Sequence, residues 1–290
     1  MSTQSPPRTA GEMLQRARSW LETRGLERSR LDAELLVAHA LGMKRLDLFM
    51  ELERPLDEDE VARARELLVR RSKGEPTAYL TGRREFYGRS FRVGPGVLIP
   101  RPETELLIDR AREIAAEQGW KNPRAVDVGT GSGCLAVTLA LELAGSKVVG
   151  IDVSEDALGW ARDNAGELGA EVELVRADGL GSWEATGLEA AELILSNPPY
   201  VDPATADELP VEVREHEPEL ALFAPAGDPD HWVGRLLAEA LPHLVPGGAL
   251  LVELGIGQAE RCLQRARAAN LDARVHPDLA RIERVLEVRV

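Results

Sequence analysis

The sequence predicts an α/β fold with a mostly parallel sheet that helices cover on both faces, preceded by a region made of helices alone. Strands and helices alternate along the chain after residue 102, and the expected strands are nearly continuous apolar runs. A glycine-rich turn joins the first of these strands to a helix. A chain of 290 residues, with 44% hydrophobic and 29% charged residues, has the composition of a globular protein with one large or two modest domains.

Residues 1–75 are expected to form a small helical bundle. Three segments carry helix start and stop signals: 11–25 ends at Gly25, 29–42 begins at a capping Ser29 and ends at Gly42, and 57–74 begins acidic and ends basic. The second segment has one apolar stripe, formed by Leu31, Leu35, Leu36, Ala38 and Leu41. Short helices with apolar faces pack together as a bundle.

Residues 76–101 are expected to form a β-hairpin linker, because aromatic and β-branched residues stand there among glycines and prolines. Residues 102–290 are expected to form the α/β domain. Its predicted helices are 103–118, 134–144, 155–169, 231–243 and 257–269. Its predicted strands are 124–129, 147–152, 172–178, 191–197 and 248–254, followed by two short strands at the end.

The charge distribution bears on possible partners. The chain has 35 Lys and Arg against 49 Asp and Glu, a formal net charge of −14. Residues 1–90 carry 17 basic and 15 acidic side chains, whereas residues 91–290 carry 18 and 34. Because phosphate contacts dominate nucleic-acid affinity, this acidic balance disfavours a stable nucleic-acid partner.

Membrane and metal sites lack sequence signals. No apolar run approaches the roughly 18 residues that span a bilayer, and the N-terminal residues do not resemble a signal peptide, so a cytoplasmic protein without a membrane partner is expected. Cys134 and Cys262 are far apart, and the five histidines have no metal-ligand spacing. Neither a disulfide framework nor a metal site is expected.

The glycine-rich turn comprises Gly129, Thr130, Gly131, Ser132 and Gly133, between an expected strand and a helix. Glycine allows close approach of the backbone to a ligand. The next strand ends in Asp152, 23 positions after Gly129, close to the offset of about 20 at which an acid reaches a ribose. Because Cys134 follows Gly133, the turn departs from the dinucleotide pattern GxGxxG, and S-adenosylmethionine is favoured over NAD.

The third strand is followed by Asp178 and Gly179, at the same expected edge of the sheet. Asp178 would accept a hydrogen bond from an adenine amino group while the Gly179 backbone lies beside the ring. An ordinary Asp-Gly turn explains the same residues equally well.

The fourth strand runs into Asn197, Pro198, Pro199 and Tyr200. The two prolines make this turn stiff and rich in carbonyl acceptors. The Asn197 side-chain oxygen and the Pro198 carbonyl would accept the two N–H bonds of an amide or aryl-amine nitrogen, with Tyr200 lying on the planar substrate group. Such positioning lowers the barrier to methyl transfer and stabilises positive charge on nitrogen without a metal or covalent intermediate. A loop that merely ends an edge strand is the structural alternative.

Taken together, the chain resembles the HemK-type release factor glutamine methyltransferases over nearly its whole length. The resemblance is carried by REFYGRSFRVGPGVLIPRPETE, DVGTGSG, Asp152, SNPPY, EVREHEPELAL and VPGGALLVELGIGQ. The Asn-Pro-Pro-Tyr motif is shared with adenine and cytosine amino methyltransferases, so the linker and the Glu-Pro segment carry the finer assignment.

The resemblance implies a class I methyltransferase fold with a Rossmann-like, seven-stranded sheet. It also implies methyl transfer from S-adenosylmethionine to the glutamine N5 of the Gly-Gly-Gln motif in class 1 peptide chain release factors, which modulates translation termination. Residues implied in cofactor binding are Gly129, Thr130, Gly131, Ser132, Gly133, Asp152 and Asn197, with Asp178 and Gly179 matching less cleanly. Asn197, Pro198, Pro199 and Tyr200 are implied in substrate binding, and Asn197, Pro198 and Tyr200 in catalysis.

Some features remain open. For Arg101 and Glu103, the family suggests the mouth of the active site, whereas a proline-led helix start explains them equally well. The sequence departs from the family pattern at 223–230 and 280–283. A nucleic-acid methyltransferase acting on an adenine or guanine amino group is the alternative enzyme, and an S-adenosylmethionine-binding regulator is the non-enzyme alternative. Residues 1–75, which lack a nucleoside-binding turn, are expected to hold the release factor.

Overall fold

The computed structural model describes residues 6–290, so the first five residues of the expected helical region 1–75 lie outside it. The chain divides into two compact units. The first unit runs to Arg83 and also contains Val211–His216, and the second comprises Arg84–Pro210 and Glu217–Val290.

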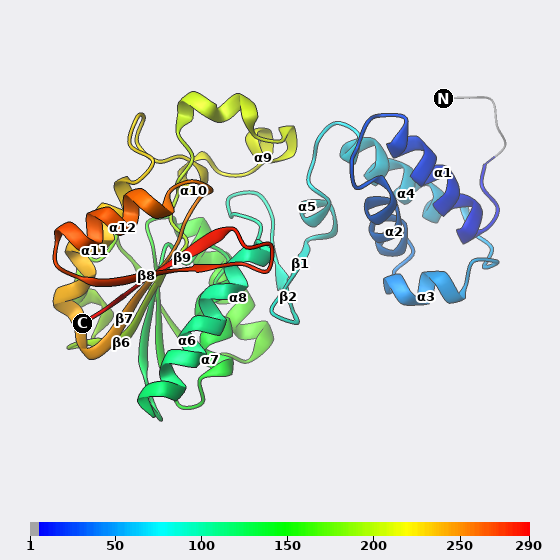
Figure 1. Ribbon diagram of the computed structural model, residues 1–290. Coiled ribbons are helices and arrows are strands. Elements are labelled where there is room, and N and C mark those ends of the chain that lie inside the picture. The colour runs from blue at the N-terminus through cyan, green and yellow to red at the C-terminus, as the bar shows by residue number, and fades with distance from the viewer. Residues whose placement is uncertain (1–5) are drawn as a thin grey trace. The chain divides into compact units, whose positions relative to one another are not determined.

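The first unit consists of helices, as the sequence predicts (Figure 1). They are α1 (Ala10–Glu22), α2 (Ser29–Ala40), α3 (Arg45–Met50), α4 (Glu58–Arg71), α5 (Thr77–Thr81) and the later α9 (Val211–His216). Thr9 caps α1, and Asp57 and Glu60 form a capping box on α4. Leu21, Leu36 and Leu48 are fully buried where the helices pack together.

Two expectations for the second helix are wrong. Ser29 is the first residue of α2 instead of its cap, and Arg28 before it forms no side-chain cap. Leu31 is 39% exposed, whereas Leu36 and Val37 are fully buried. Leu36, Ala38 and Leu41 of the predicted stripe are buried, so the expected face is right apart from Leu31.

A buried ion pair connects helices of the first unit. Arg71 Nε lies 2.8 Å from Asp32 Oδ2, and both side chains are 7% exposed. The Thr77 hydroxyl donates to Asp32 Oδ1 at 2.7 Å, and Arg71 also pairs with Glu212 on α9. Removing one partner of such a pair leaves a buried charge, which costs about 3–5 kcal/mol.

The predicted hairpin is confirmed. Strands β1 (Arg83–Phe86) and β2 (Arg89–Arg92) form a two-stranded sheet. The turn residues Tyr87 and Gly88 have φ of 51° and 70°, the positive angles of a two-residue type I′ turn. Phe86 and Phe91 are fully buried with their ring centroids 6.0 Å apart, so the hairpin contributes to the core of the second unit.

The second unit contains the predicted seven-stranded, mostly parallel sheet (Figure 1). Its strands are β3 (Arg124–Val128), β4 (Lys147–Asp152), β5 (Val172–Arg176), β6 (Ala191–Ser196), β7 (Leu244–Glu253), β8 (Asp272–Pro277) and β9 (Glu283–Arg289). Their spatial order is β5-β4-β3-β6-β7-β9-β8. In this sheet β9 pairs antiparallel with both β7 and β8, and the other described pairs are parallel. The strand order reverses between β3 and β6, and such sheets bind ligands outside the carboxyl ends of the strands at this point.

Helices cover both faces of this sheet. The longer ones are α6 (Glu105–Gln118), α7 (Cys134–Glu142), α8 (Glu155–Leu168), α11 (His231–Ala240) and α12 (Ala259–Ala268). Shorter helical turns are η1 (Pro102–Thr104), η2 (Trp183–Thr186), η3 (Pro203–Glu208), α10 (Glu219–Leu222) and η4 (Leu241–His243). In β6, Leu193 and Leu195 pack with α6 and α7, whereas Ile194 packs with α11 and α12. All three are fully buried, which explains the continuous apolar sequence of the strand.

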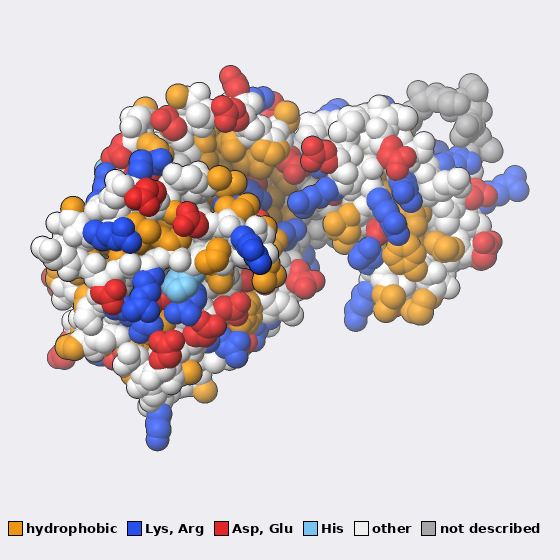
Figure 2. Space-filling view, in the orientation of Figure 1, with side chains coloured by type: hydrophobic (Ala, Val, Ile, Leu, Met, Phe, Trp, Pro, Cys, Tyr) orange, Lys and Arg blue, Asp and Glu red, His pale blue; other side chains and the backbone are white. Residues whose placement is uncertain are grey.

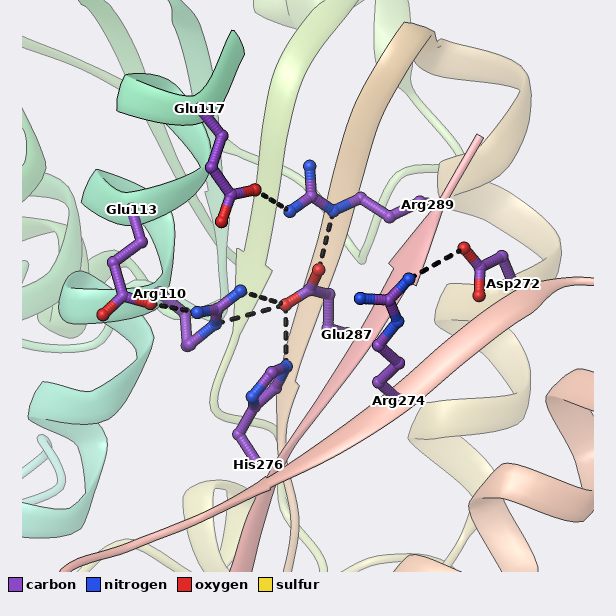
Figure 3. Close-up of polar contacts among 8 residues, drawn as sticks. All are labelled: Arg110, Glu113, Glu117, Asp272, Arg274, His276, Glu287 and Arg289. Atoms are coloured by element: carbon purple, nitrogen blue, oxygen red, sulfur yellow. Dashed lines mark hydrogen bonds and ion pairs between the residues drawn. The ribbon is translucent and has the colours of Figure 1, made fainter.

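A buried carboxylate joins α6 to the last two strands (Figure 3). Glu287 on β9 is 1% exposed and contacts Arg110 at 2.8 Å, Arg289 at 2.6 Å and His276 Nε2 at 2.8 Å. Burial alone would raise the pKa of Glu287, but the hydrogen bonds from these side chains hold it well below its usual value.

Within residues 6–290, no helix is long and apolar enough to cross a membrane. The same residues include no cluster of three or more His, Cys, Asp or Glu side chains that could hold a metal ion.

Candidate active site

The carboxyl ends of four parallel strands bring the predicted motifs to one edge of the second unit's sheet. The glycine-rich turn follows β3, Asp152 ends β4, Asp178 follows β5 and Asn197 follows β6. Because β3 lies between β4 and β6, the turn stands between Asp152 and the Asn-Pro-Pro-Tyr segment. The topology therefore places the glycine-rich turn and the Asn-Pro-Pro-Tyr segment beside each other.

The glycine-rich turn needs glycine at three positions. Gly129, Gly131 and Gly133 have φ of 76°, 55° and 78°, in the left-handed region. A Cβ at Gly133 would also lie 3.0 Å from Ala161 Cβ, whereas one at Gly129 would meet no atom within 4 Å. The turn thus packs closely against α8 on one side and leaves open space beside Gly129.

Asp152 is fixed at the end of β4 by backbone donors. Its Oδ2 accepts the Gly131 N–H at 2.9 Å, and its Oδ1 accepts the Ser154 N–H at 2.9 Å. Burial raises the pKa of Asp152, while these hydrogen bonds lower it. These two backbone donors orient the carboxylate beside the glycine-rich turn.

Asp178 and Gly179 have a neighbour that the sequence did not suggest. Arg235 of α11 donates to Asp178 Oδ1 and to the Asp178 backbone oxygen, both at 2.7 Å. Glu239 accepts the Leu180 N–H at 3.0 Å, and a Cβ at Gly179 would lie 2.8 Å from Arg235 Nη2. The adenine contact expected of Asp178 therefore has to use a carboxylate that Arg235 already orients.

The Asn-Pro-Pro-Tyr segment is tied down on both sides. Asn197 Nδ2 donates to the Thr104 hydroxyl at 3.1 Å, and Ser196, just before it, donates to the Val128 carbonyl at 2.7 Å. On the other side, the Val201 N–H donates to Leu222 O at 3.0 Å and the Val201 carbonyl accepts the Ala224 N–H at 2.9 Å. These bonds hold the turn between β6 and the chain that follows the Glu-Pro segment.

Tyr200 is held against a glycine. A Cβ at Gly255, just after β7, would lie 2.8 Å from Tyr200 Cδ2, so only glycine fits there. Burial, together with the charge of Glu253, raises the pKa of Tyr200 to about 12. The phenol therefore stays neutral near pH 7 and can serve as a packing surface.

Asp127, in β3, is a buried acid that sequence reasoning missed. It is fully buried, and its Oδ2 accepts hydrogen bonds from the Thr130 hydroxyl at 2.7 Å and the Ala136 N–H at 3.1 Å. Burial raises the pKa of Asp127 to about 7. The carboxylate fixes the glycine-rich turn to the start of α7, and its place two residues before Gly129 was the available signal.

Glu217, from the Glu-Pro segment, was also missed as a site residue. Its side chain is 1% exposed and binds Arg101 at 2.5 Å and the Ile99 N–H at 3.0 Å. Arg101 and Glu103 lie close enough for their charges to affect the pKa values of Tyr200 and Glu253. Pro102 also begins the helical turn η1 with Glu103 in its first turn, so both of the alternatives considered for Arg101 and Glu103 are compatible with the structure.

The two departures from the family pattern lie in defined structure. Phe223 forms a bridge with Val201, and Asp230 accepts hydrogen bonds from Gln258 and Arg261. Arg281 has a φ of 63°, in a turn closed by its N–H to the Asp278 carbonyl. The first departure thus starts beside the Asn-Pro-Pro-Tyr segment, and the second belongs to the β8–β9 connection.

Comparisons with known proteins agree with this arrangement. Residues 12–82 match the family model of the PrmC N-terminal domain, and residues 103–212 match that of the methyltransferase small domain. The structure resembles the hMettl16 catalytic domain in complex with MAT2A 3′UTR hairpin 6, with a TM-score of 0.54 and 16% identity, over 80% of this chain and 82% of that one. At this identity the likeness concerns the fold alone. The fold and the family models define an S-adenosylmethionine-dependent methyltransferase.

Curated relatives are similar over almost the full length. The release factor glutamine methyltransferase of Geobacter sulfurreducens is 40% identical over 97% of both chains. That of Koribacter versatilis is 43% identical over 92% of this chain and 93% of its own. The chain belongs to the release factor glutamine methyltransferase family.

Proposed function

We propose that this chain transfers a methyl group from S-adenosylmethionine to the side-chain amide nitrogen of the glutamine in the Gly-Gly-Gln motif of class 1 release factors. Family membership over nearly the whole chain supports the substrate class. The observation that carries the chemistry is the fixed Asn197 amide, beside the glycine-rich turn, with its Nδ2 bound to Thr104. Release factors act on ribosomes, so the proposed location is the cytoplasm.

The residues of the turn bind and orient the substrate amide. Asn197 Oδ1 and the Pro198 carbonyl accept its two N–H bonds, and Tyr200 packs against its plane. The amide nitrogen is a weak nucleophile because its lone pair is delocalised, so holding it in line with the methyl group supplies much of the rate gain. As positive charge develops on nitrogen, the same two acceptors stabilise it. The nitrogen–methyl bond forms as the sulfur–methyl bond breaks, the product S-adenosylhomocysteine leaves as a neutral thioether, and the proton leaves the methylated nitrogen for solvent.

S-adenosylmethionine supplies an electrophilic methyl group on a sulfonium. We assign its binding to Gly129, Thr130, Gly131, Ser132, Gly133, Asp152, Asp178, Gly179 and Asn197. The open space beside Gly129 and the oriented Asp152 carboxylate fit a nucleoside with free ribose hydroxyls. The orphaned Oδ1 of the buried Asp127 offers a further acceptor next to the turn.

We propose a division of labour along the chain. Residues 1–75 recognise the release factor, 76–101 link the domains and 102–290 catalyse. In the first unit, Leu46 and Met50 on α3 are each 70% exposed and Phe49 is 39% exposed. Hydrophobic side chains gather on the surface of this unit where α3 lies (Figures 1 and 2). An exposed apolar patch of this kind supports a role in protein binding.

The nucleic-acid alternative is not favoured. Relatives matching 92–97% of the chain are release factor glutamine methyltransferases, whereas the likeness to an RNA-bound domain extends to the fold alone. A non-catalytic regulator would not need the fixed Asn197 amide.

The direct test is incubation of the purified chain with S-adenosylmethionine and release factor, followed by mass spectrometry of the peptide that contains Gly-Gly-Gln. A gain of one methyl group on the glutamine side chain is expected. The matched control is a release factor with that glutamine changed to glutamate. Methylation of DNA or RNA with no methylation of release factor would overturn the proposal.

A further inference from the structure

Two charged side chains of α11 hold the turn that follows β5. Arg235 donates from Nη1 to Asp178 Oδ1 and from Nη2 to the Asp178 carbonyl, both at 2.7 Å. Its Nε donates to Glu239 Oε1 at 2.7 Å, and Glu239 Oε2 accepts the Leu180 N–H at 3.0 Å. The network therefore fixes the backbone on both sides of Gly179, which an isolated surface ion pair would not do.

Gly179 allows this close approach. Its φ is 66°, and a Cβ there would lie 2.8 Å from Arg235 Nη2 and 2.9 Å from Glu239 Oε2. The side chain of Arg235 is 24% exposed, whereas that of Asp178 is 67% exposed. The cation is thus the covered partner of the pair, and the carboxylate that it holds remains open to a ligand.

Arg235 occupies only one oxygen of the Asp178 carboxylate. Oδ1 accepts the guanidinium, and Oδ2 has no hydrogen-bond partner among residues 6–290. A carboxylate oxygen of this kind accepts hydrogen bonds and donates none, so the group that it binds has to be a donor. The 6-amino group of adenine is such a donor.

The free oxygen lies at the end of the strand next to the one that carries the ribose-binding acid. β5 pairs with β4 so that Arg176 stands opposite Asp152, and the Ala177 N–H donates to the Asp152 carbonyl at 3.1 Å. Asp178 is the next residue. Along this edge of the sheet, Asp178 therefore follows Asp152 as the base of a nucleoside follows its ribose.

We propose that Arg235, acting through Asp178, is a positioning residue that fixes a carboxylate oxygen for the adenine 6-amino group and so gives the site its preference for adenine. The proposal rests on the proposed function, in which Asp178 binds the cofactor. Arg235 itself touches neither the cofactor nor the substrate. By holding an exposed side chain in one conformation, it lowers the entropy that the contact with adenine loses.

The test measures the Kd of two ligands for the full chain by calorimetry: S-adenosylhomocysteine and its analogue with unsubstituted purine as the base. The wild type should bind S-adenosylhomocysteine at least about tenfold more tightly, because the analogue lacks the donor for a charged acceptor. Arg235→Met keeps a long side chain and removes the donors. Its preference should fall to within about threefold, with Tm close to that of the wild type.

A matched control removes an ion pair from the opposite edge of the sheet. Arg124 donates to Glu192 from Nε at 3.0 Å and from Nη2 at 2.7 Å, where β3 and β6 begin. Arg124→Met should therefore keep the preference of the wild type for adenine. Loss of the preference in this control as well would show that it depends on general stability, and would overturn the role of Arg235.

Asp178→Asn tests the same geometry by its sign. Because a guanidinium only donates, the new amide should turn its oxygen to Arg235 and its NH₂ to the adenine amino group, so the preference for adenine should disappear or reverse. In the double variant Arg235→Met/Asp178→Asn, the amide is free to turn its oxygen to adenine. This variant should bind S-adenosylhomocysteine at least about threefold more tightly than Asp178→Asn alone, whereas a merely structural Arg235 predicts a further loss.

The outcomes separate this proposal from the proposed function, because the two affinities are measured without release factor. A chain that shows the expected preferences but does not methylate release factor supports the role of Arg235 and contradicts the function. Equal affinity of the wild type for the two ligands, or an undiminished preference in Arg235→Met, overturns the proposal. If Arg235→Met does not fold, Asp178→Asn decides, since an adenine preference retained in that variant also overturns it.

Discussion

Replacement of Glu253 by glutamine should change the pH dependence of folding stability in a defined direction. Burial raises the pKa of this carboxyl from 4.5 to about 7. The folded chain therefore keeps a proton that the unfolded chain loses, and stability falls as pH rises from about 4.5 to 7. Above pH 7 Glu253 is ionised in both the folded and the unfolded chain, and stability no longer falls with pH. Glutamine has nearly the same shape but does not ionise, so the stability of the variant lacks this decrease with pH.

The magnitude follows from the two pKa values. One pKa unit corresponds to about 1.4 kcal/mol, so between pH 5 and pH 8.5 the variant should gain about 2–3 kcal/mol on the wild type in free energy of unfolding. Urea unfolding of both full-length chains, followed by circular dichroism at several pH values, measures this difference. A difference that is constant to about 0.5 kcal/mol over this range, or one that shifts toward the wild type, would refute the assignment of Glu253 as a buried acid.

Three further changes test other parts of the structure. Asp152→Ala should raise the Kd of S-adenosylmethionine by about tenfold or more, because a charge-assisted hydrogen-bond acceptor contributes about 1.5–3 kcal/mol. Calorimetry measures this Kd, and an unchanged value would show that Asp152 does not bind the cofactor. Glu287→Gln should lower the unfolding free energy at pH 7 by about 3–5 kcal/mol. Because the pKa of Glu287 is lowered in the folded state, the difference in unfolding free energy between wild type and variant should decrease as pH falls below about 4.5. A difference that does not depend on pH would contradict the ion pairs of Glu287 with Arg110 and Arg289. The double variant Leu46→Ser/Met50→Ser should lower kcat/KM for release factor about tenfold without affecting cofactor Kd. The control Leu279→Ser, on a fully exposed leucine of the second unit, should leave kcat/KM unchanged. Equal losses of kcat/KM in the two variants would argue against recognition by α3.

The features that the sequence predicts well are those with local signals. The alternation of apolar strands and helices predicted the sheet, and the 23-residue offset placed Asp152 beside the glycine-rich turn, where the structure also has it. The positive φ values of Gly129, Gly131 and Gly133 agree with the reason glycine was expected there.

Features that depend on long-range contacts were not predictable from one sequence. Thr104 is 93 residues from Asn197 and looks like an ordinary helix start, and Glu253 looks like the end of a buried strand. The contact between Thr104 and Asn197 depends on α6 packing against β6, which periodicity does not reveal. Val211–His216 likewise groups with the first unit through contacts such as Arg71 with Glu212. Ser29 and Leu31 were misassigned because tertiary packing, and not local propensity, set the phase of α2.

The central claim is that the Asn197 amide oxygen accepts an N–H of the glutamine side chain during methyl transfer. The most direct measurement is the kcat of Asn197→Ala on purified release factor, with the Kd of S-adenosylmethionine measured in parallel. Loss of such an acceptor, which acts most strongly as charge develops, should lower kcat by about 10²–10³-fold while Kd changes far less. A variant that keeps more than about a tenth of the wild-type kcat, or one that loses cofactor affinity as strongly as activity, would contradict the account.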